Sequence, residues 1–147
     1  MADTEPLIKD YMHTPVFTIA SEAGLDRALL IMRKQHVRHL PVVENGHMVG
    51  IISDRDLRMS MQEMEQGPAG APKGYYLPAL KKVKGVMNAQ VLTVCPDMTV
   101  AEAAGMMSDK KLGALPVVER GTDKLVGMIT ETDLLRLLVT MLKEKSA

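Results

Sequence analysis

The chain carries the same sequence pattern twice, and this duplication limits the folds that it can adopt. The pentapeptide at 40–44 (LPVVE) recurs unchanged 75 residues later, at 115–119. The segment 49–53 (VGIIS) recurs as 126–130 (VGMIT) at an offset of 77, so two residues are inserted between the matching blocks, at 121–124. A repeat of this length is one supersecondary unit present in two copies. Each copy, of about 60 residues, is marginal by itself, so we expect the two copies to pack on each other.

The first copy has the periodicity of a small unit of helices and strands. Residues 16–19 form a short β-rich run, and the apolar residues that follow have the spacing of one helix face: Leu25, Ala28, Leu29 and Met32. Two further β-rich runs flank Asn45-Gly46, which is a strong signal for a hairpin turn. Ser53 then stands where a helix N-cap belongs, before an amphipathic segment.

The second copy repeats this order. Thr99 with Glu102 three residues on is a capping-box pattern, and Gly113 is the predicted stop of that helix. Thr130 is in the N-cap position before the amphipathic segment 131–143. We therefore predict an α/β (α+β) fold of two tandem repeats, each in the order β-α-β-β-α, related by a pseudo-twofold axis.

The domain boundaries follow from the repeat. We place the first domain at 8–66 and the second at 81–147. The segment 67–80 between them opens with a run rich in glycine and proline, which is typical of a loop or flexible linker. The cleft between two like halves is a natural place for a ligand.

Charge and cysteine content exclude several classes of function. The chain has 18 Lys and Arg against 18 Asp and Glu, so its net charge of zero argues against a nucleic-acid or membrane-surface partner. A single cysteine, Cys95, permits no internal disulfide, and the acidic N-terminus lacks the features of a signal peptide. The longest apolar stretches are too short to span a bilayer. We expect a cytoplasmic protein.

The duplicated motif resembles the cystathionine-β-synthase (CBS) domain. Each copy has a threonine near its start, a helix, Leu-Pro-Val-Val, a turn, and Val-Gly followed by a hydroxyl residue with an aspartate three positions on. The resemblance covers about residues 10–143. Within the family the chain is most similar to short bacterial pairs related to acetoin-utilisation proteins, through 10–13 (DYMH) and 85–88 (GVMN).

This resemblance implies a regulatory module with no catalytic residues and no catalytic cofactor. It implies binding of an adenosine nucleotide or related adenosyl compound, of the AMP, ADP and ATP class, in the cleft between the repeats. Family members usually pair through their helices, so an apolar stripe at helical spacing predicts a homodimer: Leu134, Leu138, Met141 and Leu142. The regulated target would be a separate protein. The alternative is a structural scaffold with a vestigial cleft, whose function is dimerisation.

The segment 53–56 suits an anionic ligand on elementary grounds. A helix that begins after Ser53 presents unpaired amides and a positive dipole end, which favour phosphate. Asp56 can accept hydrogen bonds from a vicinal diol, and Arg55 can fork onto phosphate oxygens. Ser53 and Asp56 can equally serve only as a helix cap. The resemblance implies that ribose binds the aspartate, in a pocket comprising Arg38, His39, Ile52, Ser53, Arg55, Asp56, Met87, Asn88, Val91, Leu112, Gly113 and Ala114.

The corresponding site of the second copy lacks these cations, because uncharged residues replace Arg38, His39 and Arg55. The resemblance implies a second pocket comprising His13, Thr14, Val16, Val37, Arg38, Ile129, Thr130, Thr132 and Asp133. We predict that this pocket is the weaker one and holds a less charged adenosyl ligand or none.

A metal centre is not predicted. His36 and His39 are three residues apart, but no third ligand is spaced nearby. No nucleophile elbow or phosphate-binding loop is present, so a nucleotide-hydrolysing enzyme is a distant alternative.

Overall fold

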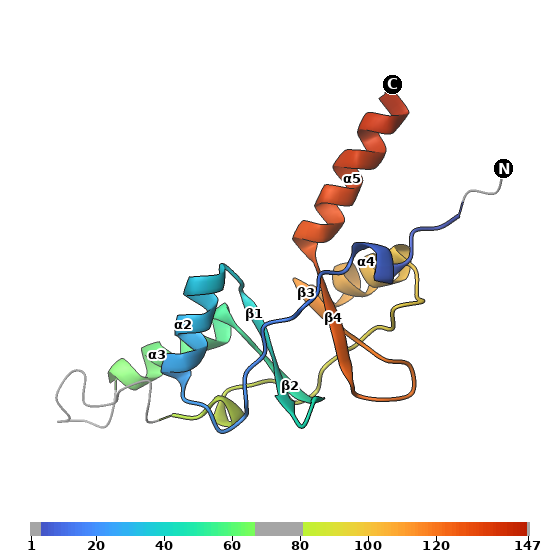
Figure 1. Cartoon of the computed structure of the whole chain (residues 1–147). Coiled ribbons are helices and arrows are strands. Elements are labelled where there is room, and N and C mark those ends of the chain that lie inside the picture. Colours follow the sequence, from blue (N-terminus) through green and yellow to red (C-terminus); the bar gives the residue numbers. More distant parts are fainter. Residues whose placement is uncertain (1–3, 67–80, 147) are drawn as a thin grey trace. The chain divides into compact units, whose positions relative to one another are not determined.

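The computed structural model describes residues 4–66 and 81–146 (Figure 1). The chain forms two compact units, one spanning Phe17–Val91 and the other combining Met1–Val16 with Leu92–Ala147. We name them the Asp56 unit and the Asp133 unit after the aspartate that each contains. The predicted linker 67–80 lies outside the described residues.

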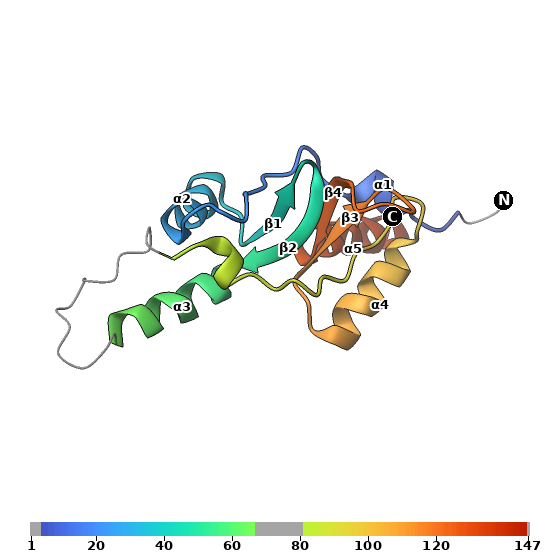
Figure 2. The same cartoon turned by 90° about the horizontal axis from the view of Figure 1, so that it is seen from below.

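The Asp56 unit is built on a hairpin. Strands β1 (His39–Glu44) and β2 (His47–Ser53) pair antiparallel, with helices α2 (Leu25–Gln35) and α3 (Asp54–Gln66) beside them (Figures 1 and 2). The two-residue turn between the strands has positive φ at both positions, 54° at Asn45 and 81° at Gly46. This is the backbone that an Asn-Gly hairpin requires, so the prediction of the turn is confirmed.

The Asp133 unit repeats this plan. Its strands β3 (Ala114–Val118) and β4 (Leu125–Thr130) form a second antiparallel pair, accompanied by α1 (Ile8–Tyr11), α4 (Val100–Lys110) and α5 (Glu131–Ser146). Thr99 caps α4 by accepting a hydrogen bond from the backbone of Glu102 at 3.0 Å, as predicted. In Figure 1, α5 extends well beyond its sheet.

The predicted helix stop at Gly113 is wrong. Helix α4 ends at Lys110, and Lys111 adopts the left-handed conformation with φ 55°. The equivalent residue of the other unit, His36, ends α2 in the same conformation. Helix α4 therefore closes at Lys111, two residues before Gly113, and both helices end on a left-handed residue that is not glycine.

The first strand of each repeat is reduced to a single bridge. Ile19 pairs parallel with Val42, and Val94 pairs parallel with Val117. The backbone of Ile19 donates to Pro41 and accepts from Val43, at 3.1 and 3.0 Å. Each repeat thus keeps the predicted order, with two full strands and one minimal one.

The lead-in segment before each repeat belongs to the unit of the other repeat. In the Asp56 unit, residues 81–91 include the 3₁₀ helix η2 (Val83–Gly85) and bond to the loop before α2. Lys82 and Lys84 contact the carboxylate of Glu22 at 2.5 and 2.6 Å, and these hydrogen bonds lower the pKa of Glu22 to about 2. In the Asp133 unit, residues 4–16 contribute α1 and bond to α4 and β4. The two lead-in segments are thus exchanged between the units. They form the N-terminal parts of the predicted domains 8–66 and 81–147, and each packs in the unit that holds the rest of the other domain.

Each unit has its own apolar core. In the Asp56 unit, fully buried aliphatic residues join α2, the hairpin, α3 and η2: Leu25, Leu40, Val42, Ile52, Leu57 and Val83. In the Asp133 unit, the corresponding cluster joins α1, α4, the hairpin and α5: Ile8, Ala103, Leu115, Val117, Ile129 and Leu137. These cores hold the strand-to-helix corners at which the predicted ligand residues lie.

Candidate functional site

Ser53 and Asp56 form a reciprocal cap at the corner between β2 and α3. The backbone amide of Ser53 donates to Asp56 Oδ2 at 2.9 Å, and the amide of Asp56 donates to Ser53 Oγ at 3.1 Å. The next amide, of Asp54, donates to the carbonyl of Arg38 at 2.8 Å. The capping role considered from the sequence is therefore real. It also fixes the carboxylate, because one oxygen is held by the backbone while Oδ1 accepts no hydrogen bond from the described residues.

The lead-in segment of the Asp56 unit lies along β2. Asn88 and Ile51 exchange two backbone hydrogen bonds, at 2.9 and 3.0 Å. Met87 packs so closely on Gly50 that a Cβ there would lie 2.6 Å from its sulfur. Met87 and Asn88 are thus brought to the strand that leads into Ser53, as the predicted pocket requires.

The other predicted residues of this pocket are placed less uniformly. Arg38 and Arg55 are exposed, His39 and Val91 are half-buried, and Ile52 is fully buried in the core. Because the Ile52 side chain is fully buried, it packs in the core of the Asp56 unit and supports the corner from there. The remaining three predicted residues belong to the Asp133 unit: Leu112, Gly113 and Ala114. Their contribution to the Asp56 pocket stays a prediction.

Asp133 is held at the equivalent corner between β4 and α5. Its Oδ2 accepts from the amide and from the hydroxyl of Thr130, at 2.8 and 3.0 Å. The amide of Asp133 in turn lies 3.3 Å from Thr130 Oγ1. As at Asp56, Oδ1 accepts no hydrogen bond from the part of the chain that the structure describes.

His13 makes the Asp133 corner different from its counterpart. Its Nδ1 lies 3.1 Å from Asp133 Oδ2, the oxygen that Thr130 already engages. The sequence placed His13 in this pocket but did not predict the contact. The repeat alignment gives no signal for this contact, because the equivalent residue, Asn88, accepts a hydrogen bond from the amide of Gln90 instead.

The rest of the predicted Asp133 pocket divides between the two units. Thr14 and Thr132 are exposed, Val16 is half-buried and Ile129 is fully buried. Val37 and Arg38 belong to the Asp56 unit, and their part in this pocket stays a prediction. Within residues 4–66 and 81–146, no group of three His, Cys, Asp or Glu side chains could hold a metal ion.

Comparison with known proteins decides the family. The family model of the CBS domain matches residues 8–63 and again residues 83–140. The chain belongs to the CBS-domain family. The resemblance stated from the sequence is confirmed, and the Ser53 and Thr130 corners are the equivalent corners of its two CBS repeats.

Proteins similar to this CBS pair include one of nearly the same length. A CBS domain-containing protein of Dictyostelium discoideum is 36% identical over 138 residues, which cover 93% of this chain and 94% of that protein.

Two solved structures share the fold and sequence of this CBS pair. The CBS domain pair of protein MJ0100, solved with 5′-methylthioadenosine and S-adenosyl-L-methionine, is 27% identical with a TM-score of 0.79, covering 94% of this chain and 99% of that one. A protein of Vibrio cholerae assigned to acetoin utilisation (AcuB) is 29% identical with a TM-score of 0.79, covering 97% of each chain. The predicted likeness to acetoin-utilisation CBS pairs is thereby confirmed.

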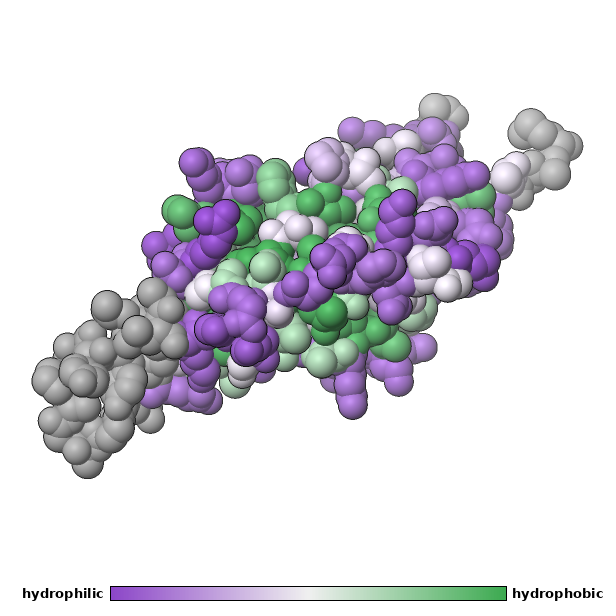
Figure 3. All heavy atoms as spheres, turned by 60° about the horizontal axis from the view of Figure 1, so that its bottom comes forward, coloured by the Kyte–Doolittle hydropathy of each residue, from purple (hydrophilic) through white to green (hydrophobic). Residues whose placement is uncertain are grey.

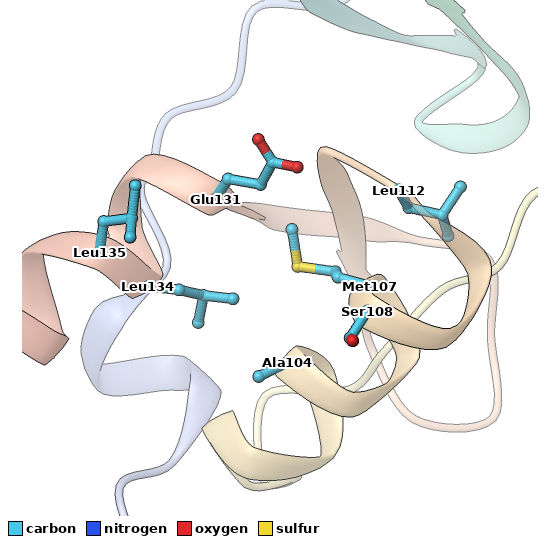
Figure 4. Close-up of a pocket in the computed structure, with 7 residues that line it drawn as sticks. All are labelled: Ala104, Met107, Ser108, Leu112, Glu131, Leu134 and Leu135. Carbon is cyan, nitrogen blue, oxygen red and sulfur yellow. The ribbon is translucent and has the colours of Figure 1, made fainter.

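A separate cavity lies within the Asp133 unit, between α4 and α5. It has a volume of about 290 Å³, and in Figure 4 the side chains of Met107, Leu134 and Ala104 surround it while the Glu131 carboxylate stands at its edge. Ser108, Leu112 and Leu135 complete its lining. Its lining includes Leu112, one of the residues predicted for ligand binding, but neither Asp56 nor Asp133. This cavity is therefore distinct from the two aspartate corners.

Apolar side chains are also exposed on the surface of this CBS pair. Figure 3 shows hydrophobic residues among hydrophilic ones on one face of the molecule. On α5, five large apolar residues are 49–60% exposed: Leu135, Leu138, Val139, Met141 and Leu142. They include three of the four residues predicted to form a dimerisation stripe. None of the described helices is both long and apolar enough to cross a membrane.

Proposed function

We propose that this CBS pair is a regulatory ligand-sensing module that binds an adenosine-containing ligand through Asp56 and Asp133. The observation that carries the proposal is the shared geometry of the two strand-to-helix corners. In each, the backbone holds one carboxylate oxygen and leaves Oδ1 for another donor. A vicinal diol, such as that of ribose, supplies suitable donors. The adenosyl ligands bound by the similar pair of protein MJ0100 support this choice of ligand class.

We further propose that nucleotides prefer the Asp56 site. Two exposed arginines, Arg38 and Arg55, flank that corner in sequence, whereas Gly113 and Thr132 take the equivalent positions in the other unit. A charge-assisted hydrogen bond to phosphate contributes roughly 1.5 to 3 kcal/mol. The absence of two such bonds corresponds to about a hundredfold or more in affinity.

Calorimetry with AMP, ATP and adenosine tests this proposal. Asp56→Ala should weaken the tight binding event at least about tenfold, because it removes the diol acceptor. Arg55→Ala should weaken AMP and ATP binding about tenfold or more and leave adenosine binding nearly unchanged. Asp133→Ala should leave the tight event nearly intact.

The matched control is Ser53→Ala, which removes the hydroxyl cap but keeps the Asp56 carboxylate and the Ser53 amide that holds it. If Ser53→Ala weakens binding as much as Asp56→Ala, the aspartate acts through helix capping and the proposal fails. The site assignment is overturned if Asp133→Ala abolishes the tight event and Asp56→Ala does not.

The exposed stripe on α5 favours a second function, dimerisation. Burial of an apolar face of this width against a second copy would stabilise a homodimer at about 25 cal/mol per Å² of apolar surface removed from water. Sedimentation at tens of micromolar should give about twice 16.1 kDa. Leu138→Asp with Leu142→Asp should give the monomer mass, while Thr140→Asp on the same helix should not.

A ligand panel separates the sensor from a pure scaffold. Ligand at a hundred times its Kd should raise the free energy of unfolding by about 2.7 kcal/mol, whereas a scaffold with a vestigial site should not respond. Thermal unfolding with AMP, ADP, ATP, S-adenosylmethionine and adenosine is sufficient for this measurement.

A further inference from the structure

The two units place different side chains at one equivalent position beside the carboxylate corner. His13 and Asn88 are 75 residues apart in the repeat alignment. His13 exchanges backbone hydrogen bonds with Met128 at 2.9 and 3.2 Å, just as Asn88 does with Ile51 at 2.9 and 3.0 Å. Because the backbone is fixed in the same way in both units, the side chain alone decides what reaches the aspartate.

The two side chains make different contacts. His13 Nδ1 lies 3.1 Å from Asp133 Oδ2, which also accepts two hydrogen bonds from Thr130. Asn88 instead uses its side-chain oxygen locally, accepting from the amide of Gln90 at 3.0 Å. Asp56 Oδ2 accepts only from the Ser53 amide among the described residues. Three donors therefore compete for Oδ2 of Asp133, whereas Oδ2 of Asp56 has a single donor among the described residues.

Burial strengthens the contact at Asp133. The side chain of Asp133 is 10% exposed and that of His13 is 48% exposed. The imidazole is thus open to protons from solvent, while the carboxylate that it contacts is largely screened from water. A hydrogen bond between imidazolium and carboxylate is roughly twice as strong as one between neutral groups.

We infer that His13 determines the specificity of the Asp133 site by making a ribose diol compete with a proton. The inference rests on the proposed function, because it takes a diol as the ligand of Asp133. When His13 is protonated, its charged ring holds Oδ2, so a diol whose two hydroxyls bind both carboxylate oxygens, Oδ1 and Oδ2, must displace the ring. Diol affinity at Asp133 therefore rises with pH between about pH 5 and 8, the range in which histidines exchange protons.

The charged groups near His13 bear on the proposed rise of diol affinity with pH. Strand β4 carries no titratable side chain, and neither do the neighbouring residues 14–16. The first turn of α5 contributes two acids, Glu131 and Asp133, and α1 contributes Lys9 and Asp10. Over their whole length α1 and α5 carry four acids and four bases, so the charged group that bears most directly on His13 is the Asp133 carboxylate, 3.1 Å from Nδ1.

Adenosine is the probe, because it carries no group that titrates between pH 5.5 and 8.0. In Asp56→Ala, where only the Asp133 site remains, calorimetry should give a Kd for adenosine about tenfold weaker at pH 5.5 than at pH 8.0. Adding His13→Asn should make the two Kd values equal within about twofold. The reciprocal change Asn88→His, in Asp133→Ala, should introduce pH dependence at the Asp56 site.

The inference is overturned if adenosine binding at the Asp133 site does not depend on pH, or if the dependence survives His13→Asn. Absence of adenosine binding to the unaltered chain at both pH values would instead refute the proposed function. A measurement without ligand then tests the contact directly. At pH 8.0, ¹⁵N spectra should show His13 as the Nδ1–H tautomer, and Asp133→Ala should change the tautomer. An unchanged tautomer overturns the inference whatever the ligand.

Discussion

Gly50 lies where the lead-in segment approaches β2 most closely, and Gly50→Ala tests how tightly that segment is held. A Cβ at this position would lie 2.6 Å from Met87 Sδ and 3.0 Å from the backbone oxygen of Asn88. The equivalent Gly127 offers a matched comparison. A Cβ there would lie 2.6 Å from Met12 Sδ and 3.3 Å from a methyl group of Thr14, so the three atoms nearest to it would belong to side chains.

The expected magnitude follows from these contacts. Neither Gly50 nor Gly127 has a positive φ, so alanine would by itself stabilise the strand by about 0.4–1 kcal/mol. At Gly50 the methyl group must displace a backbone segment that two hydrogen bonds hold in place, and overpacking of this kind costs about 1–3 kcal/mol. At Gly127 the flexible Met12 side chain can move instead. We therefore expect a net loss of about 1–2 kcal/mol for Gly50→Ala and less than about 1 kcal/mol for Gly127→Ala.

Urea unfolding followed by far-ultraviolet circular dichroism measures both free energies. Gly50→Ala should lower the unfolding midpoint with an unchanged m-value, because the amount of surface exposed on unfolding stays the same. Gly50→Ala should also weaken adenosine binding, since Met87 and Asn88 are residues of the proposed Asp56 site. The reasoning is refuted if Gly127→Ala destabilises the chain more than Gly50→Ala, or if Gly50→Ala is as stable as the unaltered chain.

Two further substitutions test single interactions. Lys82 and Lys84 lower the pKa of the Glu22 carboxylate from 4.5 to about 2. The carboxylate therefore stabilises the fold above about pH 4.5, and this effect is lost as the pH falls toward 2. Thermal melts of Glu22→Gln should accordingly show a smaller loss of stability over this pH interval than melts of the unaltered chain. An equal loss in both chains would contradict it. Ser60 is buried, and its hydroxyl has no hydrogen-bond partner among the described residues, so Ser60→Ala should match or exceed the unaltered chain in stability, by up to about 1 kcal/mol in urea unfolding. A loss of more than 1 kcal/mol would show that the hydroxyl has a partner.

Local features of the fold could be predicted because their causes are local. The Asn45-Gly46 turn, the Thr99 cap and the caps at Ser53 and Thr130 depend on residues within three positions of one another. The end of α4 was missed because Lys111 adopts the left-handed conformation that the sequence rule reserves for glycine. The backbone amides of Lys111 and Leu112 both bond to the carbonyl of Met107, so the helix closes at this point without a glycine.

The exchange of lead-in segments had no local signal. Residues 4–16 and 81–91 are short, and their own pattern does not say which repeat they join. Only the family resemblance placed His13 with Asp133, and Met87 and Asn88 with Asp56. The cap at Asp56 shows a similar limit for the site. Sequence presented capping and ligand binding as alternatives, whereas the structure gives the cap one oxygen, and the other accepts no hydrogen bond from residues 4–66 and 81–146.

The exchange gives the two sites separate means of adjustment. Residue 13 precedes the first repeat in the chain, yet it lies beside the aspartate of the second, so a change there acts directly on the Asp133 corner. Arg55, the second residue of α3, belongs to the Asp56 unit. Two corners with the same backbone therefore differ in the side chains beside the aspartate: Arg55, which we propose binds phosphate, at one, and His13, which contacts the carboxylate, at the other. Under these two proposals, one copy of a duplicated motif responds to the phosphate charge of its ligand, and the other responds to pH.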